Sequence, residues 1–204
     1  FITIQQSPDC CNAYSPYEPY ITQLYDFVQA EYAAMGKTCP TILMHQTWSF
    51  NDDMCKNNAY EYWPVNDANN AAMFADIEDA NNKAIEKLKN DKNLAKAPTL
   101  ILSGKAIQLA QDQFGYSGKA SESVANGAIY ADTISHLNPR GRYIAACVWI
   151  ETLAQEAGFT VDCRNATFVP NDSSDANDDG MTLEDCKILQ YIFLINPTNR
   201  YTLT

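Results

Sequence analysis

Residues 130–153 read YADTISHLNPRGRYIAACVWIETL, and this stretch decides how the rest of the chain is interpreted. Asn138 and Pro139 stand between a polar segment and an apolar run, in the positions of a helix N-cap and a first helical residue. An Asn side chain at the N-cap accepts a backbone N–H, and Pro at the first helical position loses no hydrogen bond. The stretch therefore predicts a helix that starts at Pro139, with Asp132 and His136 held in the segment before it.

A carboxylate close to a histidine gives this segment a catalytic interpretation. Asp132 would fix the tautomer of His136 and stabilise the imidazolium as it forms, so that His136 acts as a general base. The alternative is a capped helix that follows a surface histidine and a surface aspartate. Spacing alone leaves both interpretations open.

Three short apolar runs separated by helical patterns predict the fold class. The runs cover residues 1–5, 41–45 and 98–102. Between them, segments 17–35 and 68–92 place apolar residues at helical spacing. Alternation of strands and helices is typical of βαβ units, so we expect an α/β fold with a parallel sheet and helices on both of its faces.

The last part of the chain is predicted to be a disulfide-bonded appendage. Residues 1–158 form the α/β domain, and residues 159–204 carry an acidic loop and a helix. A bridge between Cys163 and Cys186 would close that loop and reduce the entropy of the unfolded chain. Cys147 lies within the apolar helix, where we expect a buried free thiol. Further cysteines would supply two more bridges, whose pairing the sequence leaves open: Cys10, Cys11, Cys39 and Cys55.

Length and charge limit the classes of partner. The chain has 204 residues, of which 46% are hydrophobic, enough for one domain with a core. A formal charge of −11 repels a phosphate backbone, so we expect no nucleic-acid partner. No run approaches the ~18 apolar residues that a membrane span requires. We expect a soluble protein without a membrane span.

Cysteines and glycosylation sequons together indicate a secretory route. The sequence contains seven cysteines, and Asn165 and Asn171 each begin a sequon. We therefore expect a secreted, extracellular glycoprotein. The sequence begins at Phe1 inside an apolar, β-branched run, so we expect further residues before it in the native protein.

Polar side chains follow the predicted strands, and parallel sheets bind ligands outside the carboxyl ends of their strands. The side chains at these three ends are Gln5, Gln6, His45, Gln46, Trp48 and Ser103. Together with His136 they predict a polar pocket with an aromatic wall. The glutamine amides are candidate donors to an oxyanion.

The acidic loop contains a weak candidate for a calcium site. Asp175, Asn177 and Asp179 occupy positions one, three and five before Gly180, as at the start of a calcium loop. The twelfth position is Cys186, where an EF-hand has glutamate. A solvated acidic turn is the preferred interpretation, and no other cofactor is expected.

The run HLNPRGRYIAACVWIETL, residues 136–153, resembles the last block of SGNH (GDSL-like) hydrolases, in a little-characterised branch of that superfamily. FITIQQS at residues 1–7 and TILMHQTW at residues 41–48 agree with the same branch. The resemblance covers most of residues 1–155. It implies a three-layer, flavodoxin-like fold and ester hydrolysis, with acyl esters of small molecules or carbohydrates as substrates and His136 and Asp132 as triad members.

The sequence departs from the family pattern in two places. The family spaces its acid and histidine as D-x-x-H, and the segment from Asp132 to His136 is one residue longer. The family's nucleophilic serine lies on its first strand-to-helix turn, and this sequence has no such block; Ser7 and Ser135 are poor substitutes. The resemblance therefore implies an esterase if an upstream serine block exists, and an inactive chain otherwise. The alternative is a non-catalytic extracellular structural, filament-forming or binding glycoprotein on the same fold.

The family's strand order also implies an interaction surface. The strand absent from the front of this sequence would pair with residues 1–5. An unpaired edge strand is an association hazard. We therefore expect other residues of the protein, a second copy or a partner chain to lie against residues 1–5.

Overall fold

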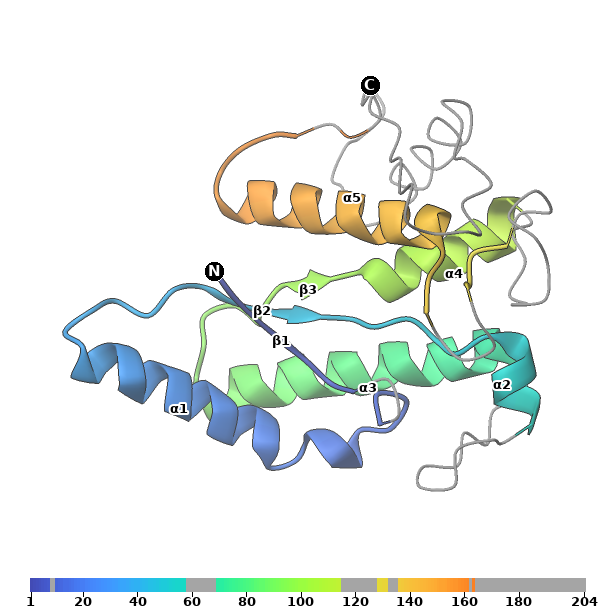
Figure 1. Cartoon of the computed structure of the whole chain (residues 1–204). Coiled ribbons are helices and arrows are strands. Elements are labelled where there is room, and N and C mark those ends of the chain that lie inside the picture. The colour runs from blue at the N-terminus through green and yellow to red at the C-terminus, as the bar shows by residue number, and fades with distance from the viewer. Residues whose placement is uncertain (8–9, 58–68, 115–127, 132–135, 162, 164–204) are drawn as a thin grey trace.

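The structure, a computed structural model, belongs to the α/β class. It describes residues 1–7, 10–57, 69–114, 128–131, 136–161 and 163. Its sheet has three parallel strands in the order β1-β2-β3 (Figure 1). The strands are β1 (Ile2–Gln5), β2 (Ile42–His45) and β3 (Leu100–Ile101). The predicted strands and their parallel pairing are confirmed.

Helices connect and follow these strands. The helices of the described residues are the 3-10 turn η1 (Ser15–Tyr17), α1 (Tyr20–Ala34), α2 (Asp52–Asn57), α3 (Asn70–Asp91), α4 (Ser103–Phe114) and α5 (Pro139–Glu156). Figure 1 shows α1 and α3 on one side of the sheet and α4 and α5 on the other. Helices thus lie on both sides of the sheet, as the alternating pattern predicts.

Strand β2 is the centre of the sheet. Ile42 lies opposite Ile2 of β1, and Met44 lies opposite Leu100 of β3. All four residues of β2 are buried. Its continuous apolar run reflects this position, because a central parallel strand is covered on both faces and along both edges.

The α4/α5 side of the sheet contains a closed core. Leu43 of β2 and Ile101 of β3 pack in one buried cluster with Ile107 of α4 and Ile144 of α5. The side chain of Asn138 accepts the backbone N–H of Gly141 at 3.2 Å, which confirms the predicted N-cap of α5. The cap fixes where α5 begins and therefore which of its residues reach this core.

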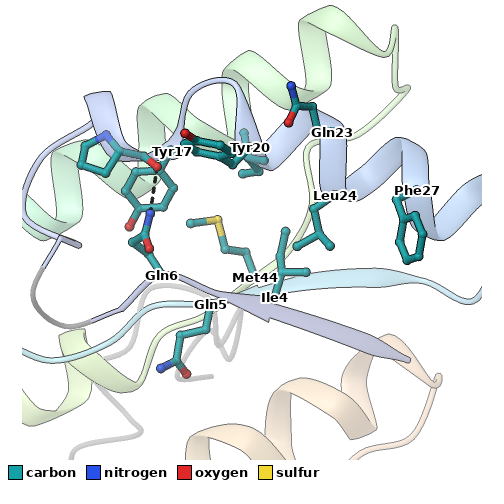
Figure 2. Close-up of a pocket in the computed structure, with 11 residues that line it drawn as sticks. Ile4, Gln5, Gln6, Tyr17, Tyr20, Gln23, Leu24, Phe27 and Met44 are labelled. Atoms are coloured by element: carbon teal, nitrogen blue, oxygen red, sulfur yellow. Dashed lines mark hydrogen bonds between the residues drawn. The ribbon is translucent and has the colours of Figure 1, made fainter.

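The α1/α3 side is covered unevenly. Met44 of β2 packs with Ala84 and Leu88 of α3, all of them buried. In α1 the buried residue is Ile21, although we expected a helix whose apolar residues face the core. Helix α1 lies by the edge strand β1 (Figure 2), which has a strand neighbour on one side only in the described structure. The three described strands therefore make a sheet that is too narrow to cover the apolar face of α1.

The predicted disulfide bonds are not present in the structure. Each of the six described cysteines carries a thiol, including Cys163, whose predicted partner Cys186 lies outside the described residues. Cys163 is buried in the α4/α5 core instead, where it forms a hydrogen bond with Cys147. This contact and burial raise the pKa of the Cys147 thiol. The predicted burial of Cys147 is confirmed.

Several sequence predictions fall on residues that the structure does not describe. They concern the helix and acidic loop of the appendage, the sequons at Asn165 and Asn171, Asp132, and the calcium candidates Asp175, Asn177 and Asp179. The division between residues 1–158 and 159–204 stays a prediction for the same reason. No helix in the described parts of the chain has both the length and the apolar character needed to cross a membrane.

Candidate functional site

The carboxyl ends of the three strands bring together a set of polar and aromatic residues, which we call the carboxyl-edge cluster. Its members are Gln5, His45, Gln46, Trp48 and Ser103. Gln5 and His45 are the last residues of β1 and β2, and Ser103 is the first residue of α4 after β3. The cluster therefore draws on all three strand ends, as the topology of a parallel sheet requires.

His45 connects the other strand ends through both of its ring nitrogens. Its Nδ1 lies 2.6 Å from Oε1 of Gln5, and its Nε2 lies 2.9 Å from Oγ of Ser103. Because Gln5 Oε1 is an acceptor, Nδ1 carries the proton and donates it. In the neutral ring Nε2 then accepts the hydroxyl hydrogen of Ser103.

The surroundings of His45 keep the ring neutral. Trp48 meets it edge-on, and the ring centre of Trp149 on α5 lies 4.9 Å from its own. Only 6% of His45 is exposed. Burial lowers the pKa of His45 from 6.5 to about 4, because the interior penalises the charged imidazolium.

Ser103, His45 and Gln5 have the order of a nucleophile, a base and an orienting group. However, the base of this set would be His45, and a histidine with a pKa of about 4 is a weak base at neutral pH. We therefore assign these three residues a structural role: they clamp the strand ends together.

Gln46 holds the start of helix α4. Its Oε1 accepts the backbone N–H of Lys105 at 3.0 Å, and its carbonyl oxygen accepts the N–H of Gly104 at 3.1 Å. Its Nε2 is buried and has no hydrogen-bond partner among the described residues. Turning the amide over would place two donors against each other at Lys105, so the orientation is determined. Gln46 is fully buried, and among the described residues its Nε2 has an N–H without a partner at the sheet's carboxyl edge.

His136 lies in a different environment from His45. It is exposed, and it belongs to a short antiparallel pairing in which Tyr130 lies opposite Leu137. The backbone N–H of Ala131 donates to the carbonyl oxygen of His136 at 2.8 Å. Asp132 lies outside the described residues, so its predicted contact with His136 stays a prediction.

Tyr130 anchors this pairing to the segment that follows β2. Its hydroxyl donates to the carbonyl oxygen of Ser49 at 3.1 Å, and the side chain is almost completely buried. Burial raises the pKa of Tyr130 to about 12, so the hydroxyl stays a donor at neutral pH. This hydrogen bond ties the Tyr130–Leu137 pairing to the segment that follows β2, which begins at Gln46.

Gln6 is separated from the rest of the predicted pocket. Figure 2 shows Gln5 and Gln6 on opposite faces of the sheet. Nε2 of Gln6 donates to the carbonyl oxygen of Pro16 at 3.0 Å. The alternation of side chains along a strand already contains this result, because adjacent residues point to opposite faces.

The sequence reasoning missed Trp149 as a neighbour of His45. Trp149 lies on α5 and is distant from His45 in the sequence, so no local pattern links the two. The described residues contain no group of three or more His, Cys, Asp or Glu side chains placed to hold a metal ion.

Comparison with known proteins gives a family without a known activity. Residues 1–181 match the family model described as "Domain of unknown function (DUF4886)". The fold is similar to the crystal structure of a DUF4886 family protein from Bacteroides uniformis ATCC 8492, with a TM-score of 0.64 and 23% sequence identity. That match covers 94% of this chain and 59% of the other. No curated protein matches.

Proposed function

We propose that this chain, which belongs to the DUF4886 family, carries the general base and an oxyanion donor of an acyl-ester hydrolase. The exposed His136 is the base, oriented by Asp132. The amide Nε2 of Gln46 is the donor. Membership of the SGNH superfamily and a three-layer arrangement are part of this proposal, and both rest on the resemblance of residues 136–153.

The proposed chemistry is a general-base acyl transfer. His136 accepts a proton from the attacking hydroxyl, either a serine of the native protein or water, as its oxygen bonds to the ester carbonyl carbon. The carbonyl oxygen becomes an oxyanion that accepts the N–H of Gln46. The protonated His136 then gives its proton to the departing alcohol as the ester bond breaks.

The side-chain N–H of Gln46, which has no partner within the described part of the chain, is the observation that carries the proposal. A buried polar group without a partner costs about 1 to 3 kcal/mol, so a fold retains one where it gains something else. The side-chain oxygen and the carbonyl oxygen of Gln46 hold the start of α4, and its backbone N–H donates to the carbonyl oxygen of Ile101 in β3 at 3.0 Å. The donor is therefore held rigidly before a substrate arrives, as stabilisation of an oxyanion requires.

The contrast between the two histidines supports His136 as the base. His45 uses both ring nitrogens and is kept neutral by burial. His136 has an exposed side chain, and the pairing that precedes it is hydrogen-bonded through Tyr130 to the segment that follows β2. Substrates of parallel sheets bind on that side of the strands. A base must reach the solvent-accessible nucleophile, and of the two only His136 is accessible.

The test measures hydrolysis of p-nitrophenyl acetate by the native protein. We expect His136→Ala to lower kcat about 10²- to 10⁴-fold, the range of a lost general base. Gln46→Glu keeps an acceptor for Lys105 and replaces the donor with an oxygen. We expect it to lower kcat about 10²-fold with little change in KM, because the donor acts on the transition state.

Ile150→Ala is the matched control, since Ile150 is exposed on α5 outside the carboxyl-edge cluster. It should leave kcat unchanged, and thermal unfolding should show that all three variants fold. Loss of activity on Ser103→Ala with no effect of His136→Ala would transfer catalysis to the buried clamp. A native protein that hydrolyses neither p-nitrophenyl esters nor acetylated oligosaccharides would contradict the proposal.

A second function has support from another part of the molecule. The exposed apolar residues of α1 favour a binding or structural protein. Under this alternative the carboxyl-edge cluster only stabilises the fold. A native protein that hydrolyses no ester but binds a partner through α1 would establish it.

A further inference from the structure

The chain turns back along helix α5 at the point where the helix ends. Gly158 has a positive φ of 80°, and the N–H of Phe159 donates to the carbonyl oxygen of Ala154 at 2.8 Å. These are the marks of a Schellman motif, which reverses the direction of the chain after a helix. Figure 1 shows the trace after α5 running back over that helix. We call residues 159–163, of which 159–161 and 163 are described, the return segment.

The length of the return segment brings Cys163 back to the middle of α5. Cys147 lies 11 residues before Gly158, which is about 16 Å along a helix axis. The five residues that end at Cys163 reach at most about 17 Å, so the segment is just long enough. The backbone N–H of Cys163 donates to the carboxylate of Glu151 at 3.1 Å. Glu151 is four residues after Cys147, so the two lie on the same face of α5.

The two thiols meet inside the α4/α5 core. Cys147 is 4% exposed and Cys163 is 7% exposed, and both belong to one buried cluster. Their side chains are hydrogen-bonded to each other. Cys39, by contrast, donates its thiol hydrogen to the carbonyl oxygen of Pro40 at 3.5 Å. The fold therefore places two cysteines in side-chain contact that are far from adjacent in the sequence.

We propose that Cys147 and Cys163 are a redox pair, which forms a reversible disulfide bond with a small-molecule disulfide as the oxidant. The structure describes the pair in its reduced form. The two sulfur atoms must approach to about 2.05 Å to form the bond. They already contact each other, so neither has to leave another cysteine. The bond would tie the return segment to the core on the α4/α5 side of the sheet.

The hydrogen bond gives the two thiols different roles. It raises the pKa of the Cys147 thiol, so Cys147 keeps its proton and donates it to Cys163. Cys163 then loses its own proton to solvent first, because the donated hydrogen bond stabilises its thiolate. The return segment also gives access to Cys163. Phe159 is 70% exposed, and a segment with few buried apolar contacts opens at low free energy.

The reaction is a thiol–disulfide exchange with glutathione disulfide. The Cys163 thiolate attacks one sulfur, the S–S bond breaks, and one glutathione thiolate leaves. That thiolate takes the proton of Cys147, and the Cys147 sulfur attacks Cys163 and releases the second glutathione. The second thiolate takes up the proton that Cys163 gave to solvent. Two protein thiols are oxidised, and one glutathione disulfide is reduced to two thiols.

Peptide mapping of the 204-residue chain tests the proposal after equilibration with glutathione and alkylation with N-ethylmaleimide. Trypsin leaves both cysteines on one peptide, residues 143–164, because no Lys or Arg lies between Arg142 and Arg164. We expect this peptide to lose two hydrogen atoms and to escape alkylation as the proportion of glutathione disulfide rises. Cys186 lies on the next tryptic peptide, residues 165–187, so a bond to Cys186 would give a cross-linked pair of peptides instead.

Three variants show which thiols are required. Cys147→Ala and Cys163→Ala should each leave the remaining cysteine alkylated or bound to glutathione. Cys163→Ala changes a residue outside α5, so it tests the pair without altering the helix. Cys39→Ala is the matched control and should leave the internal bond of peptide 143–164 intact. Circular dichroism should show that all three variants are folded.

The melting temperature measures whether the bond ties the return segment to the core. A disulfide that closes a loop of this length reduces the entropy of the unfolded chain. The oxidised chain should therefore melt about 5 to 10 °C above the reduced chain. The difference should persist in Cys39→Ala and disappear in Cys147→Ala.

Three outcomes would overturn the proposal. The first is a peptide 143–164 that carries two alkyl groups at every glutathione ratio. The second is a cross-link to peptide 165–187, which would make Cys186 the partner of Cys163. The third is an equal melting temperature for the oxidised and reduced chains. None of these results depends on whether the protein hydrolyses esters.

Discussion

The two sides of the sheet differ in how completely they are covered. On the α4/α5 side, Leu43, Ile101 and Ile144 are fully buried in one cluster. On the α1/α3 side, Leu24 and Phe27 remain exposed although α1 is more apolar on average than α4 or α5. The difference shows that an apolar stripe predicts which face of a helix can pack against a sheet. The width of the sheet decides whether that face is buried.

The carboxyl-edge cluster belongs to the closed side. His45 joins Gln5 and Ser103 there, and Trp149 of α5 covers its ring. The open side has an apolar groove of about 440 Å³ between Ile4 and Met44 of the sheet and Leu24 and Phe27 of α1, which we call the α1 groove. We therefore expect substitutions on the closed side to change the free energy of unfolding, and substitutions on the open side to change binding. The following predictions test this division.

The largest expected effect is that of Gly104→Ala on the closed side. A Cβ at Gly104 would overlap the carbonyl oxygen of Thr47 and lie 2.9 Å from the Phe74 ring. The backbone at Thr47 cannot move without disturbing the hydrogen bonds of Gln46, so we expect a loss of about 3 kcal/mol or more in urea unfolding. Gly36→Ala is the control, because its Cβ meets no atom within 4 Å. Its positive φ of 66° should cost about 1 kcal/mol.

A smaller effect is expected from the titration of His45. Its pKa is about 4 in the folded protein and 6.5 when unperturbed, so the unfolded state binds the proton more tightly. The stability from neutral His45 is complete above pH 6.5 and is lost as the pH falls from there toward 4. Between pH 7.5 and pH 5 this loss amounts to about 2 kcal/mol.

Urea unfolding at the two pH values measures this loss. His45→Gln removes the titrating ring and keeps an amide between the strand ends. The variant is expected to be less stable than the native chain at pH 7.5 and to show about 2 kcal/mol less dependence on pH. Equal pH dependence in the two proteins would show that His45 is not a buried neutral clamp.

The smallest expected effect is that of Leu24→Ala on the open side. Leu24 is 44% exposed, so we expect a change below about 1 kcal/mol in the free energy of unfolding. Ile144→Ala removes a fully buried side chain from the closed side and should cost about 2 to 5 kcal/mol. Similar losses for the two variants would mean that other residues cover the α1 groove in solution.

Local signals in the sequence predicted most of the regular structure. Apolar β-branched runs located the three strands, and Asn138 followed by Pro139 located the start of α5. These signals work because they depend on neighbouring residues, through backbone geometry and capping. The predicted bond between Cys163 and Cys186 is not supported: it relied on the position of the two residues along the chain, whereas Cys163 packs against Cys147 in the core and Cys186 lies outside the described residues.

The candidate site could be predicted only in outline. The topology of a parallel sheet brought Gln5, His45 and Ser103 together at one edge, as the rule for strand ends predicts, and left Gln6 on the other face. That these residues form a ligand site stays a prediction. The rule did not distinguish the two histidines. His45 ends β2 and His136 lies just before α5, so each stands at the end of a regular element. Burial separates them, and burial depends on Trp149, Ser103 and other residues far away in the sequence.

The sequence by itself determined the α/β class, the three parallel strands and the capped start of α5, because strand propensity, alternation and capping act between close neighbours. The tertiary structure decided which histidine is buried, that Nε2 of Gln46 lacks a partner among the described residues, and which face of α1 stays exposed. These properties depend on the number of strands beside β1 and on the helix that covers β2. Such contacts join residues from distant parts of the chain, and no local pattern contains them.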